Sequence, residues 1–110
     1  MSFITHRRGH LINYSGKFNE SMLGQEVTLD EYLELQYPEY LREQFPAQAT
    51  ADRDREWCAI LAATVPGDTL WLWRFVDWND VADGAPYERG GLAAKRDGKV
   101  ICVWLVWEGR

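Results

Sequence analysis

The segment from residue 69 to the C-terminus constrains the fold most strongly, because it holds two apolar runs rich in tryptophan. Residues 69–78 read TLWLWRFVDW and residues 90–107 read GGLAAKRDGKVICVWLVW, and together they contain five of the six tryptophans. Within the second run, Asp97-Gly98 favours a two-residue hairpin turn with positive φ at both positions. The sequence therefore predicts a strand over 69–76 and a hairpin over 90–107 at the centre of a small sheet.

The turn also sets the register expected within the hairpin. Arg96 should pair with Lys99, and Gly91 with Trp104, so that a large ring lies opposite a glycine. The strand and the hairpin are apolar on both faces, which is typical of strands covered on both sides. Helices are expected on one face. The N-terminal segment, the 77–89 segment, a second subunit or a ligand would cover the other.

The middle of the chain carries helix signals. Thr28 and Glu31 match a capping box, in which each side chain binds the backbone N–H of the other residue. Pro46 is expected to end a second helix, and Thr50 to cap a third whose apolar residues repeat at helical spacing. The predicted helices cover residues 28–36, 38–45 and 51–65.

These elements predict one α+β domain over residues 1–110, since this length suits a single domain. We expect a mostly antiparallel sheet of about three to five strands, with two to three helices packed on one face. Residues 3–14 are expected to supply an edge strand. Residues 77–89, DWNDVADGAPYER, read as a long polar loop, and loops of this length are often functional.

Charge is unevenly distributed along the chain, whose net charge is −5. Residues 20–56 carry ten acidic and three basic side chains, a balance of −7, whereas residues 1–19 carry three basic and no acidic ones. Nucleic-acid binding usually needs a basic face, so a nucleic-acid partner is not expected. A partner protein with a basic surface, or a second copy of the chain, fits this composition better.

Other classes of protein find no support in the sequence. The apolar stretches fall well short of the ~20 residues that span a bilayer, and the N-terminus does not resemble a signal peptide, so we expect a cytoplasmic protein with no membrane contact. Neither a nucleophile elbow nor a phosphate-binding glycine loop is present. His6 and His10 flank a glycine and lack an evident third metal ligand. We therefore assign no catalytic residue, metal or cofactor, and lean against an enzyme.

Two groups of residues are candidates for binding. The first is aromatic and cationic and lies in or beside the apolar strand: Trp73, Arg74, Trp78, Tyr87 and Arg89. Aromatic and arginine side chains are enriched at interface hot spots, although most tryptophans in a small domain belong to its core.

The second group is an acidic surface on the predicted helices, with Glu31 and Glu34 as its candidate binding residues. Its full membership is Glu26, Asp30, Glu31, Glu34, Glu39 and Glu43. A run of charges is most often a solvated face, and the alternative is recognition of a basic partner.

A resemblance adds a little to this interpretation. Residues 67–71, GDTLW, followed by residues 91–100, GLAAKRDGKV, resemble the C-terminal strand, loop and hairpin of small uncharacterised bacterial proteins. The resemblance implies a bacterial or phage-like origin and supports the hairpin. It implies no catalytic or binding residue.

Two functional hypotheses follow. The first is a small acidic protein-interaction module, for example an immunity or inhibitor protein that binds a basic toxin or nuclease. The second is a small ligand-binding domain or enzyme with a tryptophan-lined pocket that holds Arg74 and Trp78 and is closed by the 77–89 loop. A homo-oligomer that covers the second sheet face is compatible with either.

Overall fold

The computed structural model describes residues 4–110 and shows an α+β fold with a six-stranded antiparallel sheet and three α-helices. The elements follow in the order β1 (Ile4–His6), β2 (Ile12–Asn13), η1 (Glu20–Met22), β3 (Leu23–Val27), α1 (Leu29–Gln36), α2 (Glu39–Gln44), α3 (Pro46–Ala63), β4 (Thr69–Ala82), β5 (Ala85–Arg96) and β6 (Lys99–Gly109). The strand order is β1-β6-β5-β4-β3, and β2 also pairs with β6. The predicted fold class and the central hairpin are confirmed. The sheet has one strand more than expected, because the N-terminal segment forms both β1 and β2. Phe3, which the predicted edge strand included, lies outside the described residues.

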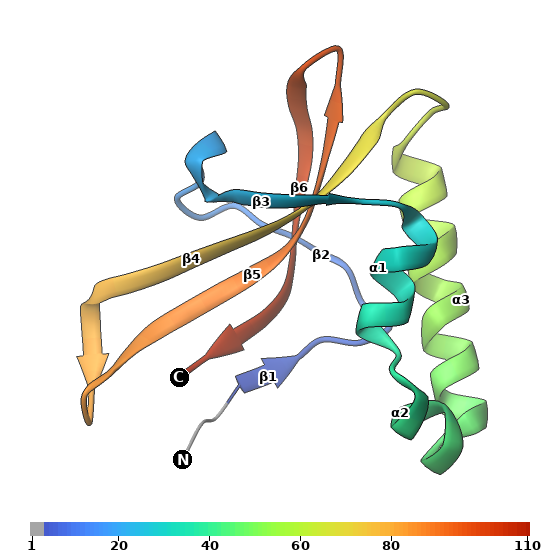
Figure 1. Ribbon diagram of the computed structural model, residues 1–110, viewed down its shortest axis with the longest axis horizontal. Helices are drawn as coiled ribbons and strands as arrows, with labels where there is room; N and C mark the ends of the chain where they lie inside the picture. The colour runs from blue at the N-terminus through green and yellow to red at the C-terminus, as the bar shows by residue number, and fades with distance from the viewer. Residues whose placement is uncertain (1–3) are drawn as a thin grey trace.

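The helices lie together beside one end of the sheet, and the hairpin of β4 and β5 extends away from them (Figure 1). The core between helices and sheet is formed by Val27, Tyr32, Leu33, Tyr37, Ala49, Ile60, Leu70, Leu92, Ala94, Trp104 and Val106. Thr28 and Glu31 form the predicted capping box at the start of α1. No helix within residues 4–110 is both long and apolar enough to cross a lipid bilayer.

The boundary between the second and third helices differs from the prediction. Pro46 does not end a helix but begins α3, and Thr50 lies inside that helix rather than at its cap. Proline suits the first helical position, because its fixed φ matches the helix and its missing N–H would have no helical partner there. The break between α2 and α3 lies at Phe45, whose backbone leaves the helical region.

The chain between β2 and β3 covers the sheet face opposite the helices. Trp73 is 2% exposed on this face, and the ring centres of Tyr14 and Phe18 lie 4.8 and 5.7 Å from its own. The indole Nε1 of Trp73 donates a hydrogen bond of 3.0 Å to the Trp104 carbonyl oxygen. Of the coverings that the sequence left open, the N-terminal segment is therefore the one observed around Trp73.

The segment 77–89 is not a loop. β4 continues to Ala82, β5 begins at Ala85, and Asp83-Gly84 forms the turn between them with φ of 53° and 76°. Asp-Gly is the same hairpin signal that the sequence shows at Asp97-Gly98. The polar side chains that precede this turn led to the prediction of a loop where the second half of β4 lies. A register shift between Asp77 and Val81 accommodates them.

The register of the β5–β6 hairpin is also corrected. Residues beside the turn pair as predicted, but Ile101 is an extra residue on β6, and the pairing shifts there by one. Leu92 therefore lies opposite Trp104, and Gly91 opposite Leu105. A β-bulge of this kind turns the following residues to the other face. As a result, Trp104 packs with Leu92 against the helices.

Candidate functional site

The seven candidate binding residues do not form one site. Trp73 is buried, Trp78 is 71% exposed near the end of the β4–β5 hairpin, and Arg74 forms an ion pair with Glu88. We call residues 77–87 the arm. In the strand register they pair only with each other, beyond the points where β3 and β6 pair with β4 and β5. Arg74 lines two hollows together with Trp107, one of which also includes Trp73, and Trp78 lines neither of the two. The hypothesis of a tryptophan-lined binding pocket stays a prediction.

Tyr87 and Arg89 do lie together, on the sheet face that carries Trp73. The Arg89 guanidinium carbon is 5.2 Å from the centre of the Phe75 ring and 5.9 Å from that of Tyr87. The Tyr87 hydroxyl donates a 2.8 Å hydrogen bond to Glu108, which also pairs with Arg7. The bond from Tyr87, together with the Arg7 guanidinium, lowers the pKa of Glu108. These contacts join β5 and β6 at the base of the arm, while among the described residues Arg7 Nε and Arg89 Nε are buried without a hydrogen-bond partner.

Glu31 and Glu34 lie in a second place, beside a hollow of about 460 Å³ on the surface of α1. We call it the acidic hollow, and its lining residues are Gln25, Val27, Asp30, Glu31, Glu34 and Leu35. Three carboxylates thus surround one depression whose apolar part includes Leu35, a side chain that is 63% exposed. Arg42 pairs with Glu34 at 3.3 Å, with both side chains about half exposed, and such a pair is weak.

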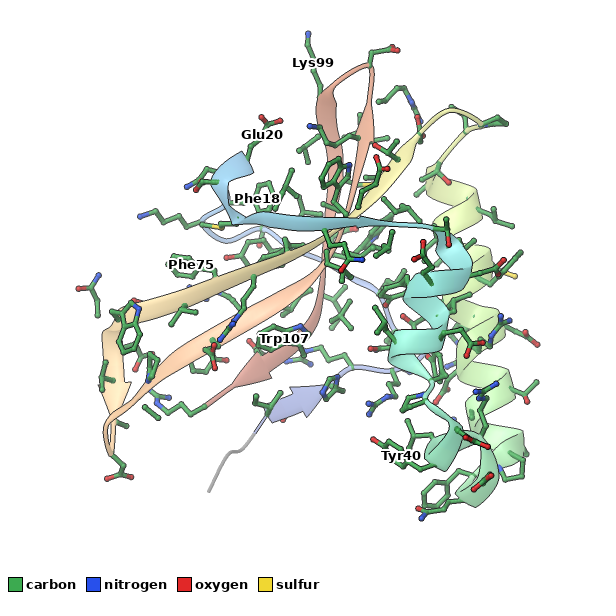
Figure 2. All side chains as sticks on the ribbon, in the orientation of Figure 1. Phe18, Glu20, Tyr40, Phe75, Lys99 and Trp107 are labelled. Atoms are coloured by element: carbon green, nitrogen blue, oxygen red, sulfur yellow. The ribbon has the colours of Figure 1, made fainter. Side chains whose placement is uncertain are left out.

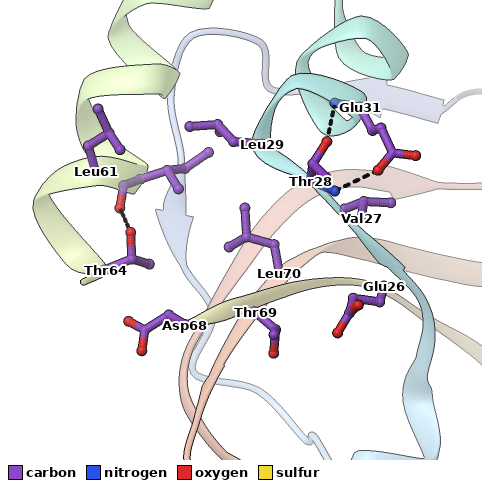
Figure 3. Close-up of a pocket in the computed structure, with 11 residues that line it drawn as sticks. Glu26, Val27, Thr28, Leu29, Glu31, Leu61, Thr64, Asp68, Thr69 and Leu70 are labelled. Atoms are coloured by element: carbon purple, nitrogen blue, oxygen red, sulfur yellow. Dashed lines mark hydrogen bonds between the residues drawn. The ribbon is translucent and has the colours of Figure 1, made fainter. Parts of the chain in front are cut away.

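A neighbouring hollow of about 410 Å³ lies between the start of α1 and the end of α3 (Figure 3). At its rim, Glu31 and Thr28 are joined by the two hydrogen bonds of the capping box. Asp68 also lines it, but the carboxylate is held by Arg96 through bonds of 2.9 and 2.8 Å. These bonds, with one from the Val65 N–H, lower the Asp68 pKa to about 2. The Asp68 carboxylate is therefore occupied by its bonds to Arg96. Glu31 lines both hollows.

A buried polar cluster, which no sequence motif marks, joins the N-terminal segment to the helices. Glu56 of α3 is fully buried and accepts hydrogen bonds from the hydroxyls of Tyr32, at 2.5 Å, and Tyr37, and from the Gly9 N–H at 3.2 Å. The Arg8 side chain also donates to the Gln36 carbonyl oxygen at 2.8 Å. Arg8 and Gly9 of the segment HRRGH are therefore docked on the helices, while Arg7 pairs with Glu108 of β6. The available signal was the spacing of Glu56 and Ile60, which places both on one helix face.

The two tyrosines of this cluster predict a loss of stability in alkali. Burial first, and then the nearby Glu56, raise the pKa of Tyr32 and Tyr37 above the ordinary value of 10.0. Above about pH 10 the unfolded chain releases both phenolic protons while the folded chain retains them, so the free energy of unfolding falls as pH rises. We expect a slope of about −1.4 kcal/mol per pH unit for each tyrosine, measured by urea unfolding.

The control for this prediction is a matched tyrosine on the surface. The double variant Tyr32→Phe/Tyr37→Phe should lose most of the alkaline slope. Tyr40→Phe should keep it, since Tyr40 is 55% exposed. An unchanged slope in the double variant would show that other groups control stability at high pH.

Comparison of the chain with protein-family models, with curated proteins and with solved structures gave no match. The resemblance of the C-terminal segment to small bacterial proteins therefore stays a prediction.

Proposed function

We propose that this chain is a small protein-interaction module whose acidic hollow binds a lysine or arginine side chain of a basic partner protein. The observation that carries the proposal is the convergence of Asp30, Glu31 and Glu34 with the exposed Leu35 around one hollow. Lysine and arginine combine a cationic head with an apolar stem. The carboxylates would bind the head, and Leu35 would contact the stem.

The charges around the hollow support the same proposal. Glu26, Glu39 and Glu43 are exposed on β3 and α2, and the whole chain carries a net charge of −5. Complementary fields speed and orient the approach of a basic protein. Glu34 can exchange Arg42 for a partner's cation at little cost, because exposed ion pairs contribute little. An immunity or inhibitor protein against a basic toxin or nuclease is the concrete form of the proposal.

Charge reversal in the hollow should abolish most of the affinity. In the variant Asp30→Lys/Glu34→Lys, two cations would repel the partner's basic side chain, and we expect binding roughly 100-fold weaker. Glu31 is left intact because its carboxylate caps the Thr28 N–H. The partner would be captured with the tagged wild-type chain, purified, and titrated by calorimetry against both proteins.

The matched control is Glu20→Lys/Asp54→Lys, which changes the net charge equally at two exposed acids outside the hollow. Glu20 lies on η1, well separated from α1 in Figure 2. We expect this control to keep an affinity within about threefold of wild type, since rim charges have small effects. Equal weakening of both variants would mean that only net charge matters, and the proposed site would be wrong.

A further inference from the structure

The hollow between the start of α1 and the end of α3 has apolar walls and adjoins the acidic hollow. Val27, Ile60 and Leu70 form its buried lining, whereas Leu61 of α3 lines it and is 53% exposed. In Figure 3 the side chains of Leu29 and Leu70 point into the space between α1, α3 and β4. We call this depression, of about 410 Å³, the apolar hollow.

Three polar side chains that line the apolar hollow already have partners within the chain. The Thr64 hydroxyl donates a 2.7 Å hydrogen bond to a backbone carbonyl oxygen of α3, and the Thr69 hydroxyl oxygen accepts one of 3.0 Å from the Trp71 indole. The Asp68 carboxylate is bonded to Arg96. An occupant would therefore gain mainly by burying apolar surface, which favours an aliphatic side chain over a polar group.

The apolar and acidic hollows meet at the junction of β3 and α1. Val27 and Glu31 line both of them, so neighbouring side chains of one partner would reach both. The Glu31 carboxylate therefore lies at their shared edge, and the exposed Glu26 adds a second negative charge beside the apolar hollow. These charges favour a partner that is basic around its apolar residue.

We propose that the apolar hollow binds a large aliphatic side chain of the same partner whose lysine or arginine enters the acidic hollow. The inference rests on the proposed function and adds the second type of residue that the partner must present. Apolar side chains that fill pockets carry much of the binding energy of an interface, whereas exposed charges mainly orient the approach. A basic protein without a neighbouring aliphatic side chain would therefore be a poor partner.

Short peptides test the inference without the natural partner. The probe is acetyl-Leu-Leu-Lys-Leu-Leu-amide, which carries leucine at the first and second positions on both sides of its lysine. One comparison peptide replaces every leucine by alanine, and another replaces the lysine by glutamine. Each peptide is titrated into the protein with ¹³C-labelled methyl groups and followed by NMR.

We expect the leucine peptide to shift the methyl signals of Leu61 and Leu70 saturably, together with those of Leu35 in the acidic hollow. The alanine peptide should shift Leu35 but not Leu61. It should bind about tenfold more weakly, because no leucine side chain is buried in the apolar hollow. The glutamine peptide should also bind about tenfold more weakly, because it lacks the cation that the carboxylates bind.

A variant of α3 removes part of the wall of the apolar hollow. Leu61→Ala should weaken binding of the leucine peptide about fivefold, because less apolar surface is buried, and should leave binding of the alanine peptide unchanged. Ile101→Ala is the matched control, at an exposed aliphatic residue of β6 that lines neither hollow. It should leave the affinities of both peptides unchanged.

The outcomes separate this inference from the proposed function. Equal affinity of the leucine and alanine peptides overturns the inference alone, as does tighter binding of the leucine peptide that leaves the Leu61 methyl signals unmoved. Equal affinity of the lysine and glutamine peptides, or no saturable binding of the leucine peptide, overturns the proposed function and this inference with it.

Discussion

Glu56→Ala is expected to lower the free energy of unfolding by about 4 kcal/mol, close to the whole stability of many small domains. The substitution leaves the hydroxyls of Tyr32 and Tyr37 without their acceptor in a buried site. The Gly9 N–H loses one of its two acceptors and keeps its 2.9 Å bond to the Tyr37 hydroxyl oxygen. Each orphaned donor costs about 1–3 kcal/mol, and the lost side chain leaves a cavity as well. Urea unfolding followed by circular dichroism measures the change.

A control and a rescue make this prediction specific. Asp54→Ala, at an exposed residue of the same helix, should change stability by less than about 0.5 kcal/mol. The triple variant Tyr32→Phe/Tyr37→Phe/Glu56→Met removes both hydroxyls with their acceptor. It leaves only the Gly9 N–H without an acceptor. It should therefore recover at least about half of the loss, because a buried polar group can be replaced by an apolar one when most of its partners go too. A loss below about 1 kcal/mol in Glu56→Ala would contradict the prediction.

The Glu56 cluster matters for the acidic hollow because it holds the helix on which that hollow lies. Tyr32 and Tyr37 lie in α1 and just beyond its end, Glu56 lies in α3, and Gly9 lies between β1 and β2. One carboxyl group thus joins three segments that are far apart in sequence. Its loss should loosen α1, whose surface carries the acidic hollow.

Local signals predicted the parts of this fold that depend on neighbouring residues. The capping box of Thr28 and Glu31 and the turn at Asp97-Gly98 were both predicted, since each is determined by a few adjacent residues. The acidic surface on α1 could also be expected from helical spacing. The sequence did not show that Asp30, Glu31 and Glu34 share a hollow with Leu35, which follows from the packing of β3 against α1.

Features that depend on tertiary contacts were missed. The bulge at Ile101 shifts the hairpin register, and no turn residue marks it. The turn at Asp83-Gly84 is an exception, because its Asp-Gly signal is local and is present in the sequence. The polar residues before it favoured a loop instead. Burial of Glu56 depends on donors supplied by Tyr32 and Tyr37, which the sequence cannot place against it.

The position of Trp107 on the sheet depends on two glycines of β5. Gly90 lies opposite Trp107, and a Cβ atom added there would lie 2.4 Å from the indole ring. The predicted pairing of a glycine with a large ring therefore occurs, at Gly90 and Trp107 rather than at Gly91 and Trp104. Gly91 has a stricter requirement, because its close neighbours are backbone atoms of β6.

Gly91→Ala is expected to destabilise the protein by about 3 kcal/mol or more. The added Cβ would lie 2.0 Å from the Trp104 carbonyl oxygen and 2.9 Å from the Val106 nitrogen. Neither atom can move aside as a side chain does, so β5 and β6 would have to separate at the centre of the sheet. The surface around Trp107, which Gly91 helps to line, should change shape as well. Urea unfolding gives the stability, and the Trp107 indole signal in NMR reports the local change.

Gly24→Ala supplies the matched control, because Gly24 lies on the edge strand β3 and its added Cβ would meet only the Leu72 carbonyl oxygen at 3.5 Å. That distance is an ordinary contact, and replacing a strand glycine by alanine restricts the unfolded chain. We therefore expect a change between zero and about 1 kcal/mol in favour of the folded state. If Gly91→Ala were as stable as Gly24→Ala, β5 and β6 could not approach as closely as described. That result would contradict the explanation that Gly90 and Gly91 are needed to seat Trp107 on the sheet.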